Sequence, residues 1–184
     1  MHSSEELLDV FDSNGELLGK SKPRAQVHKT GDWHKTVHVW IISSQGELLL
    51  QKRSESKESH PGLWDISCAG HIKSGQTSTD AAIKEAREEL GLFLKEKDIE
   101  LLFSVKNQSV EHQGAFIDNE ISDVYLVCRD IDNSNLLLQA SEVSAVRWIH
   151  YKKLKERLTI NPNEYVPHDE EYEKLFEVLH RRHK

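Results

Sequence analysis

The apolar positions of the chain fall into short runs separated by polar turns, which predicts several β-strands and a few helices. Residues 36–43 form a β-branched run, a Ser-Gln-Gly turn follows, and residues 47–53 form a second apolar run. Residues 7–11 and 16–20 flank Asp-Ser-Asn-Gly, a sequence typical of a β-hairpin. Further strands are expected at 64–67, 99–105, 120–128 and 144–150, helices at 151–158 and 168–182, and loops at 21–35, 54–62 and 106–119. This mixture is typical of an α/β fold.

The clearest helical pattern lies between residues 78 and 90. Ser78 and Thr79 suit the start of a helix, and Gly91 suits its end because glycine adopts the left-handed conformation at low cost. One apolar stripe is made by Ile83, Ala86 and Leu90. Three carboxylates lie away from that stripe: Glu85, Glu88 and Glu89. The pattern predicts an amphipathic helix with an acidic face that does not contact the core.

This acidic face has two interpretations. Glutamates at i, i+3 and i+4 repel one another by a few tenths of a kcal/mol per pair even on an exposed helix. A hard divalent cation reverses the sign of that interaction, and Mg²⁺ and Mn²⁺ prefer oxygen ligands of this kind. A solvated surface helix rich in glutamate explains the same residues without a metal.

The residues that precede the helix favour the metal site. Five residues separate Gly70 from Gln76, and seven more separate Gln76 from Lys84. This spacing resembles the box of the Nudix hydrolase family, G-x5-E-x7-R-E-U-x-E-E-x-G-U with U aliphatic. The chain matches it at Gly70, Glu85, Ala86, Glu88, Glu89, Gly91 and Leu92. It departs at Gln76, where the family has glutamate, and at Lys84, where it has arginine, and lysine cannot form arginine's planar bidentate contact.

Composition limits the class of protein. The chain has 184 residues, of which 37% are hydrophobic and 30% charged, and this suits one domain over residues 1–184. We find no apolar run of membrane-spanning length and no signal-peptide pattern at the start of the sequence. Two cysteines without metal-site spacing favour a reducing cytoplasm, and the net charge of −7 argues against a nucleic-acid binder. We expect a cytoplasmic monomer or homodimer that binds neither membrane nor nucleic acid.

A second stretch resembles one branch of the Nudix family, the isopentenyl diphosphate isomerases. It is QKRSESKESHPGLWD at residues 51–65, followed by a Gly-His-Ile turn. The resemblance implies that Arg53, Lys57 and Arg24 hold a substrate diphosphate, since a diphosphate needs several fixed cationic donors. An ordinary exposed lysine explains Lys57 equally well.

The same resemblance implies a second metal site made of histidines and carboxylates. Its residues are His28, His34, His71, Asp118 and Glu120. Imidazole and carboxylate together suit Mn²⁺, Zn²⁺ or Fe²⁺. The gap between His28 and His34 is one residue shorter than in the isomerases, and histidines that merely line a polar cleft explain the pattern as well. His38, between strand neighbours, is interpreted as structural.

The chain lacks the catalytic residues of an isomerase. Ala69 stands where the isomerases have a cysteine, and Cys68 lies one position earlier, which in a strand points it to the opposite face. No tyrosine occurs between Leu94 and Asn119, where the isomerases use one. We therefore interpret Cys68 as a buried structural thiol.

The two resemblances together predict a Nudix-like α/β/α sandwich with a mixed β-sheet. Its N-terminal hairpin would lie in residues 1–20 and its Nudix box in residues 70–92. The expected function is Mg²⁺- or Mn²⁺-dependent hydrolysis of a diphosphate linkage in a small nucleoside, sugar or isoprenoid substrate. Glu88, Glu89 and Glu120 are the expected catalytic carboxylates, and the residues expected to bind substrate are Arg24, Arg53, Lys57 and Lys84. An isomerase-like enzyme and a non-catalytic diphosphate-binding module are the alternatives.

Overall fold

Strand β3 (Trp33–Ile42) is the strand on which the sheet is built. It pairs antiparallel with β6 (Cys68–His71) and parallel with β8 (Phe116–Cys128). The other strands are β1 (Leu7–Phe11), β2 (Leu17–Pro23), β4 (Glu47–Arg53), β5 (Trp64–Asp65), β7 (Glu100–Glu111) and β9 (Val143–His150). The computed structural model describes residues 6–111 and 116–182. Within them the strands form one mixed sheet, in which β7 pairs with β8 and β9 with β4.

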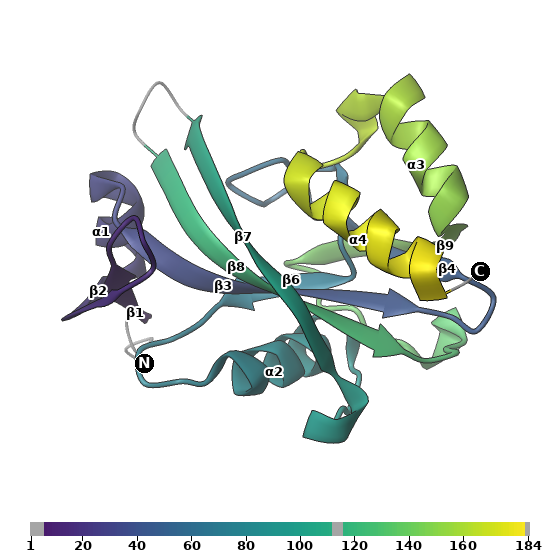
Figure 1. The fold of residues 1–184 in the computed structure, drawn as a ribbon, viewed down its shortest axis with the longest axis horizontal. Coiled ribbons are helices and arrows are strands. Elements are labelled where there is room, and N and C mark those ends of the chain that lie inside the picture. The colour runs from purple at the N-terminus through teal and green to yellow at the C-terminus, as the bar shows by residue number, and fades with distance from the viewer. Residues whose placement is uncertain (1–5, 112–115, 183–184) are drawn as a thin grey trace.

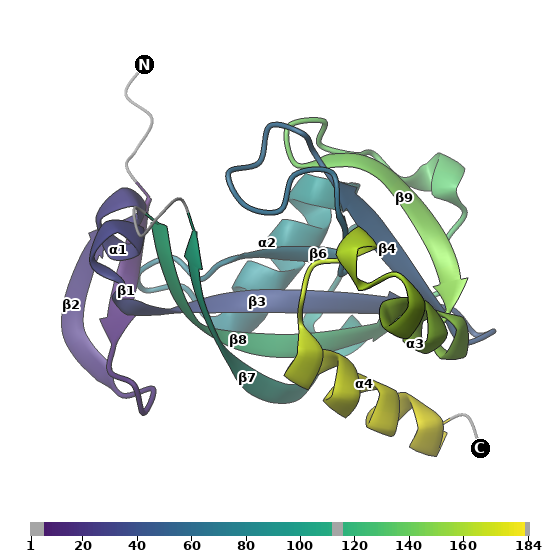
Figure 2. The same cartoon turned by 90° about the horizontal axis from the view of Figure 1, so that it is seen from above.

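Helices cover both faces of this sheet (Figures 1 and 2). Their bounds are α1 (Arg24–Thr30), α2 (Ser78–Leu90), α3 (Tyr151–Ile160) and α4 (Asp169–Arg182). Side chains alternate along β3, so Val37, Val39 and Ile41 pack with α2 whereas Trp40 and Ile42 pack with α3 and α4. The two cores on either side of the sheet confirm the predicted α/β/α sandwich.

The structure differs from the sequence prediction in two segments expected to be loops. Residues 21–35 contain α1, whose Val27 and His28 are buried. Residues 106–119 extend the paired strands β7 and β8, apart from residues 112–115, which lie outside the described residues. These strand ends were not predicted, because their polar side chains give no apolar pattern. The pairing from Lys106–Ile121 to Glu111–Phe116 depends on backbone hydrogen bonds.

The N-terminal hairpin of β1 and β2 is present, and β2 continues to Pro23. Residues 1–5 of the predicted segment lie outside the described residues. In the described part of the chain, no helix combines the length and the apolar character that crossing a membrane requires.

Candidate active site

The five residues of the predicted histidine site come together from four elements. The parallel register of β3 and β8 pairs His34 with Glu120, and the register of β3 and β6 puts His71 opposite Thr36. His28 comes from α1, with its ring centroid 4.9 Å from that of His34 and 5.3 Å from that of His71. Each of the three imidazoles offers a nitrogen within 4.8 Å of the other two.

The two carboxylates complete this cluster. Asp118 Oδ1 lies 3.4 Å from His28 Nε2 and 3.5 Å from His34 Nε2. Glu120 Oε1 lies 3.7 Å from His34 Nε2 and 4.0 Å from His71 Nε2. Three of the atoms that converge are buried without a hydrogen-bond partner: His34 Nε2, His71 Nε2 and Asp118 Oδ1. Such unpaired buried polar atoms cost free energy unless something pairs with them, and a metal ion would accept their lone pairs.

Backbone carbonyls orient two of these rings for ligation. His28 Nδ1 lies 2.9 Å from the carbonyl of Arg24, and His34 Nδ1 lies 3.1 Å from that of Asp32. Because a carbonyl can only accept, each Nδ1 carries the proton, and in the neutral ring Nε2 keeps its lone pair. Burial also holds the pKa of His71 well below its usual value, which keeps that ring neutral. The donor set therefore fits a transition-metal ion.

The glutamates of α2 form a second acidic cluster on the other side of β6. The helix begins after Thr77, whose side chain accepts from the Asp80 amide, so the N-cap lies one residue earlier than predicted. Gly70 leaves room for Glu85, because a Cβ there would lie 2.4 Å from Glu85 Cδ. Lys84 Nζ lies 2.8 Å from Glu85 and 2.7 Å from Glu88. Lysine at this position of the box thus neutralises two of the three carboxylates.

Glu89 is buried, contrary to the expectation that all three glutamates point away from the core. Its side chain is only 5% exposed and accepts a hydrogen bond of 3.2 Å from Gln51 of β4. Burial and the nearby Glu85 raise the pKa of Glu89 to about 8. Burial likewise raises the pKa of Glu85. A divalent cation would remove this penalty, so the cluster fits the ion that its resemblance implies.

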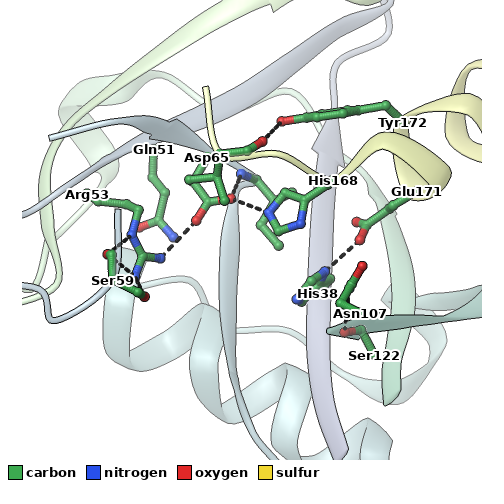
Figure 3. A network of polar contacts seen from close by, with 12 residues as sticks. His38, Gln51, Arg53, Ser59, Asp65, Asn107, Ser122, His168, Glu171 and Tyr172 are labelled. Carbon is green, nitrogen blue, oxygen red and sulfur yellow. Dashed lines mark hydrogen bonds and ion pairs between the residues drawn. The ribbon is translucent and has the colours of Figure 1, made fainter. Parts of the chain in front are cut away.

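The guanidinium group of Arg53 makes most of its hydrogen bonds to other residues of the protein (Figure 3). Its Nη1 donates to Asp65 Oδ2 at 2.9 Å, while Nε and Nη2 donate to the Ser59 carbonyl at 3.1 and 3.0 Å. Nη2 also donates to the Ser59 hydroxyl. These bonds use four of the five guanidinium N–H groups, so Arg53 shapes the loop of residues 54–62.

The other cations predicted to bind substrate have partners of their own. Lys57, in that loop, forms an ion pair with Glu142. Arg24 lies 3.7 Å from Glu6, beside the histidine cluster, where its charge acts on His71. Lys84 and Lys57 lie near the glutamates, since the charge of Lys57 acts on Glu89. The predicted site residues therefore fall into two groups around β6. Arg24 lies with the histidines, and Lys57 and Lys84 lie with the glutamates.

A buried polar network near the site was not predicted. His38 Nδ1 lies 2.7 Å from Glu171 Oε2, and Trp40 donates to the other oxygen of Glu171 at 2.7 Å. His168 Nε2 lies 2.9 Å from Asp65 Oδ1, and Figure 3 shows the two pairs side by side. His38 was interpreted as structural, and it is buried in an ion pair with Glu171, although the side chains of His38, His168 and Glu171 also offer ligand atoms within 4.8 Å of one another. Glu171 lies 133 residues away on α4, and no sequence pattern points to it.

The two neighbouring residues of β6 face different cores. Cys68 is fully buried in the core with α2, whereas Ala69 packs against the core with α4. Burial, with Glu89 and Glu85 nearby, raises the pKa of the Cys68 thiol well above its usual value. Cys68 is therefore buried, as predicted, and burial of this kind disfavours the reactive thiolate.

Comparison with known proteins supplies the family. Residues 32–169 match the family model described as NUDIX domain. Nudix hydrolase 3 of Arabidopsis thaliana is 45% identical over 184 residues, an alignment that covers 97% of this chain and 24% of that protein. The chain thus spans about a quarter of the length of that relative.

Two further relatives match more of their own length. An isopentenyl-diphosphate Delta-isomerase of Serratia proteamaculans is 29% identical over 162 residues, covering 88% of this chain and 86% of that one. A crystal structure of a Deinococcus radiodurans protein has a TM-score of 0.70 and 25% identity, covering 96% of this chain and 98% of that chain. The chain belongs to the Nudix hydrolase family, which cleaves pyrophosphate bonds.

Proposed function

We propose that the chain is a metal-dependent hydrolase that cleaves a diphosphate linkage in a small nucleoside, sugar or isoprenoid substrate. One observation carries this proposal: Glu85, Glu88 and Glu89 lie within one turn of α2, and burial together with the nearby Glu85 raises the pKa of Glu89 to about 8. Lys84 forms ion pairs with Glu85 and Glu88, whereas Glu89 accepts only a neutral hydrogen bond from Gln51, so no cation of the protein pairs directly with it among the described contacts.

The glutamate cluster would hold Mg²⁺ or Mn²⁺. When bound, such an ion polarises a phosphoryl oxygen and lowers the pKa of a water molecule. Glu85, Glu88 and Glu89 are the proposed ligands, and Lys84 limits repulsion among them while the ion is absent. Glu88 and Glu89 thereby serve catalysis by fixing charge at the reacting phosphate.

The cations around β6 would bind the diphosphate. Lys57 and Lys84 carry their charges beside the glutamates, and Arg53 holds the loop that carries Lys57. Arg24, next to the histidines, would hold the far end of the anion. Phosphoryl transfer depends mainly on positioning and on charge stabilisation, so these residues contribute to turnover as well as to affinity.

The histidine cluster is proposed as a second, separate metal site. Its support is the convergence of three unpaired buried atoms: His34 Nε2, His71 Nε2 and Asp118 Oδ1. The sequence prediction makes Glu120 the acceptor of a proton from water. Its contacts with His34 and His71 favour a role as metal ligand instead. The donor set suits Mn²⁺, Zn²⁺ or Fe²⁺.

The same cluster is the observation that favours an isomerase-like enzyme as a second candidate. Against it stands Ala69, which has no acid or thiol, and Cys68 lies in the opposite core. We therefore expect no formation of dimethylallyl diphosphate from isopentenyl diphosphate. Product analysis after incubation with Mg²⁺ and Mn²⁺ tests this, and conversion at enzyme-like rates would make the isomerase the better assignment.

A phosphate-release screen tests the hydrolase. Nucleoside, sugar and isoprenoid diphosphates are each incubated with Mg²⁺, Mn²⁺ or EDTA. Release that needs a divalent ion and disappears in Glu88→Gln supports the proposal. Binding of the same diphosphates without any release would identify a binding module.

A further inference from the structure

The loop between β8 and β9 is fixed to the catalytic end of α2. The amide of Leu137 donates to the carbonyl of Leu90 at 3.0 Å, and the amide of Gln139 donates to the carbonyl of Glu89 at 3.0 Å. The amide of Glu142 then donates to the carbonyl of Gln139 at 2.8 Å. Glu142 therefore sits on a turn whose position is set by the backbone of a proposed metal ligand.

The same turn holds the loop of residues 54–62. The amide of Ser54 donates to the carbonyl of Glu142 at 2.9 Å, and the Ser56 hydroxyl donates to the carbonyl of Ser141 at 3.3 Å. The side chains of Lys57 and Glu142 form an ion pair across the two loops. Their side chains are 25% and 31% exposed, so an anion from solution can reach this pair.

The pair borders the glutamate cluster. The positive charge of Lys57 and the negative charge of Glu142 both act on the buried carboxyl of Glu89. Other carboxylates close to β6 are already engaged by fixed partners: Asp65 by Arg53 and His168, and Glu120 by the histidines. Glu142 differs because its partner is a flexible lysine expected to bind the substrate.

We propose that a bound diphosphate draws Lys57 away from Glu142, and that the freed Glu142 carboxylate accepts the proton of the attacking water. This inference rests on the proposed hydrolase function. The water oxygen forms a bond to phosphorus, and the P–O bond to the leaving phosphate breaks with its electron pair on the leaving oxygen. The water proton moves to a carboxylate oxygen of Glu142. Proton acceptance thus becomes available only when the substrate is in place.

The exchange of partners is energetically accessible. A partly exposed lysine–carboxylate pair is weak, because water screens it and two long side chains must be held in one geometry. A diphosphate offers Lys57 more negative charge than one carboxylate does. Loss of its partner then leaves the Glu142 carboxylate as an unpaired base, on a turn that is bonded to the backbone of Glu89 through Gln139.

The variant Glu142→Gln separates this role from others. It frees Lys57 permanently, so methylene diphosphonate, which cannot be hydrolysed, should bind about threefold more tightly than to the wild type. At the same time kcat should fall by on the order of 10²-fold, because a general base is missing. Calorimetric titration and steady-state kinetics measure the two effects, and Glu177→Gln, at an exposed position of α4, is the matched control.

Three outcomes would overturn the assignment. A kcat within threefold of the wild type removes Glu142 from proton transfer. Weaker diphosphonate binding together with slow turnover marks Glu142 as a structural residue, and loss of Mn²⁺ affinity marks it as a metal ligand. The binding experiment does not need hydrolysis. If the wild type binds the diphosphonate but releases no phosphate from any diphosphate substrate, the hydrolase function itself is refuted. If Glu142→Gln is as active as the wild type, only the role of Glu142 is refuted.

Discussion

Asp65 holds Arg53 in a buried ion pair, with Oδ2 of Asp65 2.9 Å from Nη1 of Arg53. The second oxygen of Asp65 lies 2.9 Å from Nε2 of His168, so one carboxylate links the start of α4 to the arginine that shapes the loop of residues 54–62. The orientation of Arg53 is therefore set by residues outside the Nudix box.

Replacing Asp65 with asparagine should weaken substrate binding more than it slows chemistry. We expect KM for a diphosphate substrate to rise about tenfold, equal to ~1.4 kcal/mol, with kcat within a few-fold of the wild type. Removal of one partner of a buried pair should also cost about 3 kcal/mol of unfolding free energy. Kinetics and urea unfolding check both effects, with Glu173→Gln on the exposed side of α4 as control. An unchanged KM would mean that Arg53 acts independently of Asp65.

The His38–Glu171 pair should make stability depend on alkaline pH. Burial opposes the charge of His38, but Glu171 outweighs it and raises the pKa of His38 to about 9. Since the folded-state pKa is higher than the unfolded value of about 6.5, the stabilisation is complete below pH 6.5 and is lost as pH rises through 9.

This loss should amount to about 3 kcal/mol of unfolding free energy for the wild type between pH 6.5 and 9.5. Urea unfolding across this range measures it. The variant His38→Gln should show a much flatter profile, although it is less stable at neutral pH. An equal slope in both proteins would assign the pH dependence to other groups.

Glu88→Gln and Glu89→Gln should both cut kcat by on the order of 10²-fold or more, because each removes a charged ligand. Their effects on the metal-free protein should differ. Glu89 is 5% exposed with Glu85 nearby, so its neutral variant should be more stable than the wild type in EDTA at pH 8. Glu88 is bonded to Lys84 at the surface, so its variant should change stability little. Thermal unfolding and turnover are the measurements, and normal turnover in both variants would exclude α2 from the mechanism.

The double variant His34→Ala/His71→Ala should lose one equivalent of Mn²⁺ or Zn²⁺ per chain and keep its metal at the glutamates. Metal analysis after dialysis checks the content, with His180→Ala of α4 as an exposed control. Ligation needs neutral imidazole. Burial opposes the charge of His34, but Glu120 and Asp118 outweigh it and raise the pKa of His34, so occupancy of this site in the wild type should fall as the pH is lowered and His34 takes up a proton. Equal metal content in the wild type and the double variant would show that the histidines only line a polar surface.

The sequence predicted the elements with strong apolar patterns. Strands β3, β4 and β8 and helices α2 and α4 follow from β-branched runs or from a stripe such as Ile83, Ala86 and Leu90. Helix α1 was missed because it has only seven residues after a proline, too few to show a periodic stripe. The ends of β7 and β8 were missed because their pairing depends on the backbone.

The candidate site was predictable only where a motif names its residues. The resemblance to the Nudix box and to the isomerases supplied the glutamates and the histidines, and the registers of β3 with β6 and β8 bring the histidines together. The other contacts join residues that lie far apart in the sequence. Glu171 lies 133 residues from His38, and Glu142 lies 85 residues from Lys57, so only tertiary structure pairs them.

Strand β6 limits how this sequence can change. Gly70 supports Glu85 on the face of α2, and the next residue, His71, points to the histidine cluster on the other face. Inserting or deleting one residue in this four-residue strand would exchange the two faces and disable both centres together. Substitutions within β6 keep the alternation of its two faces, whereas a change of length by one residue does not.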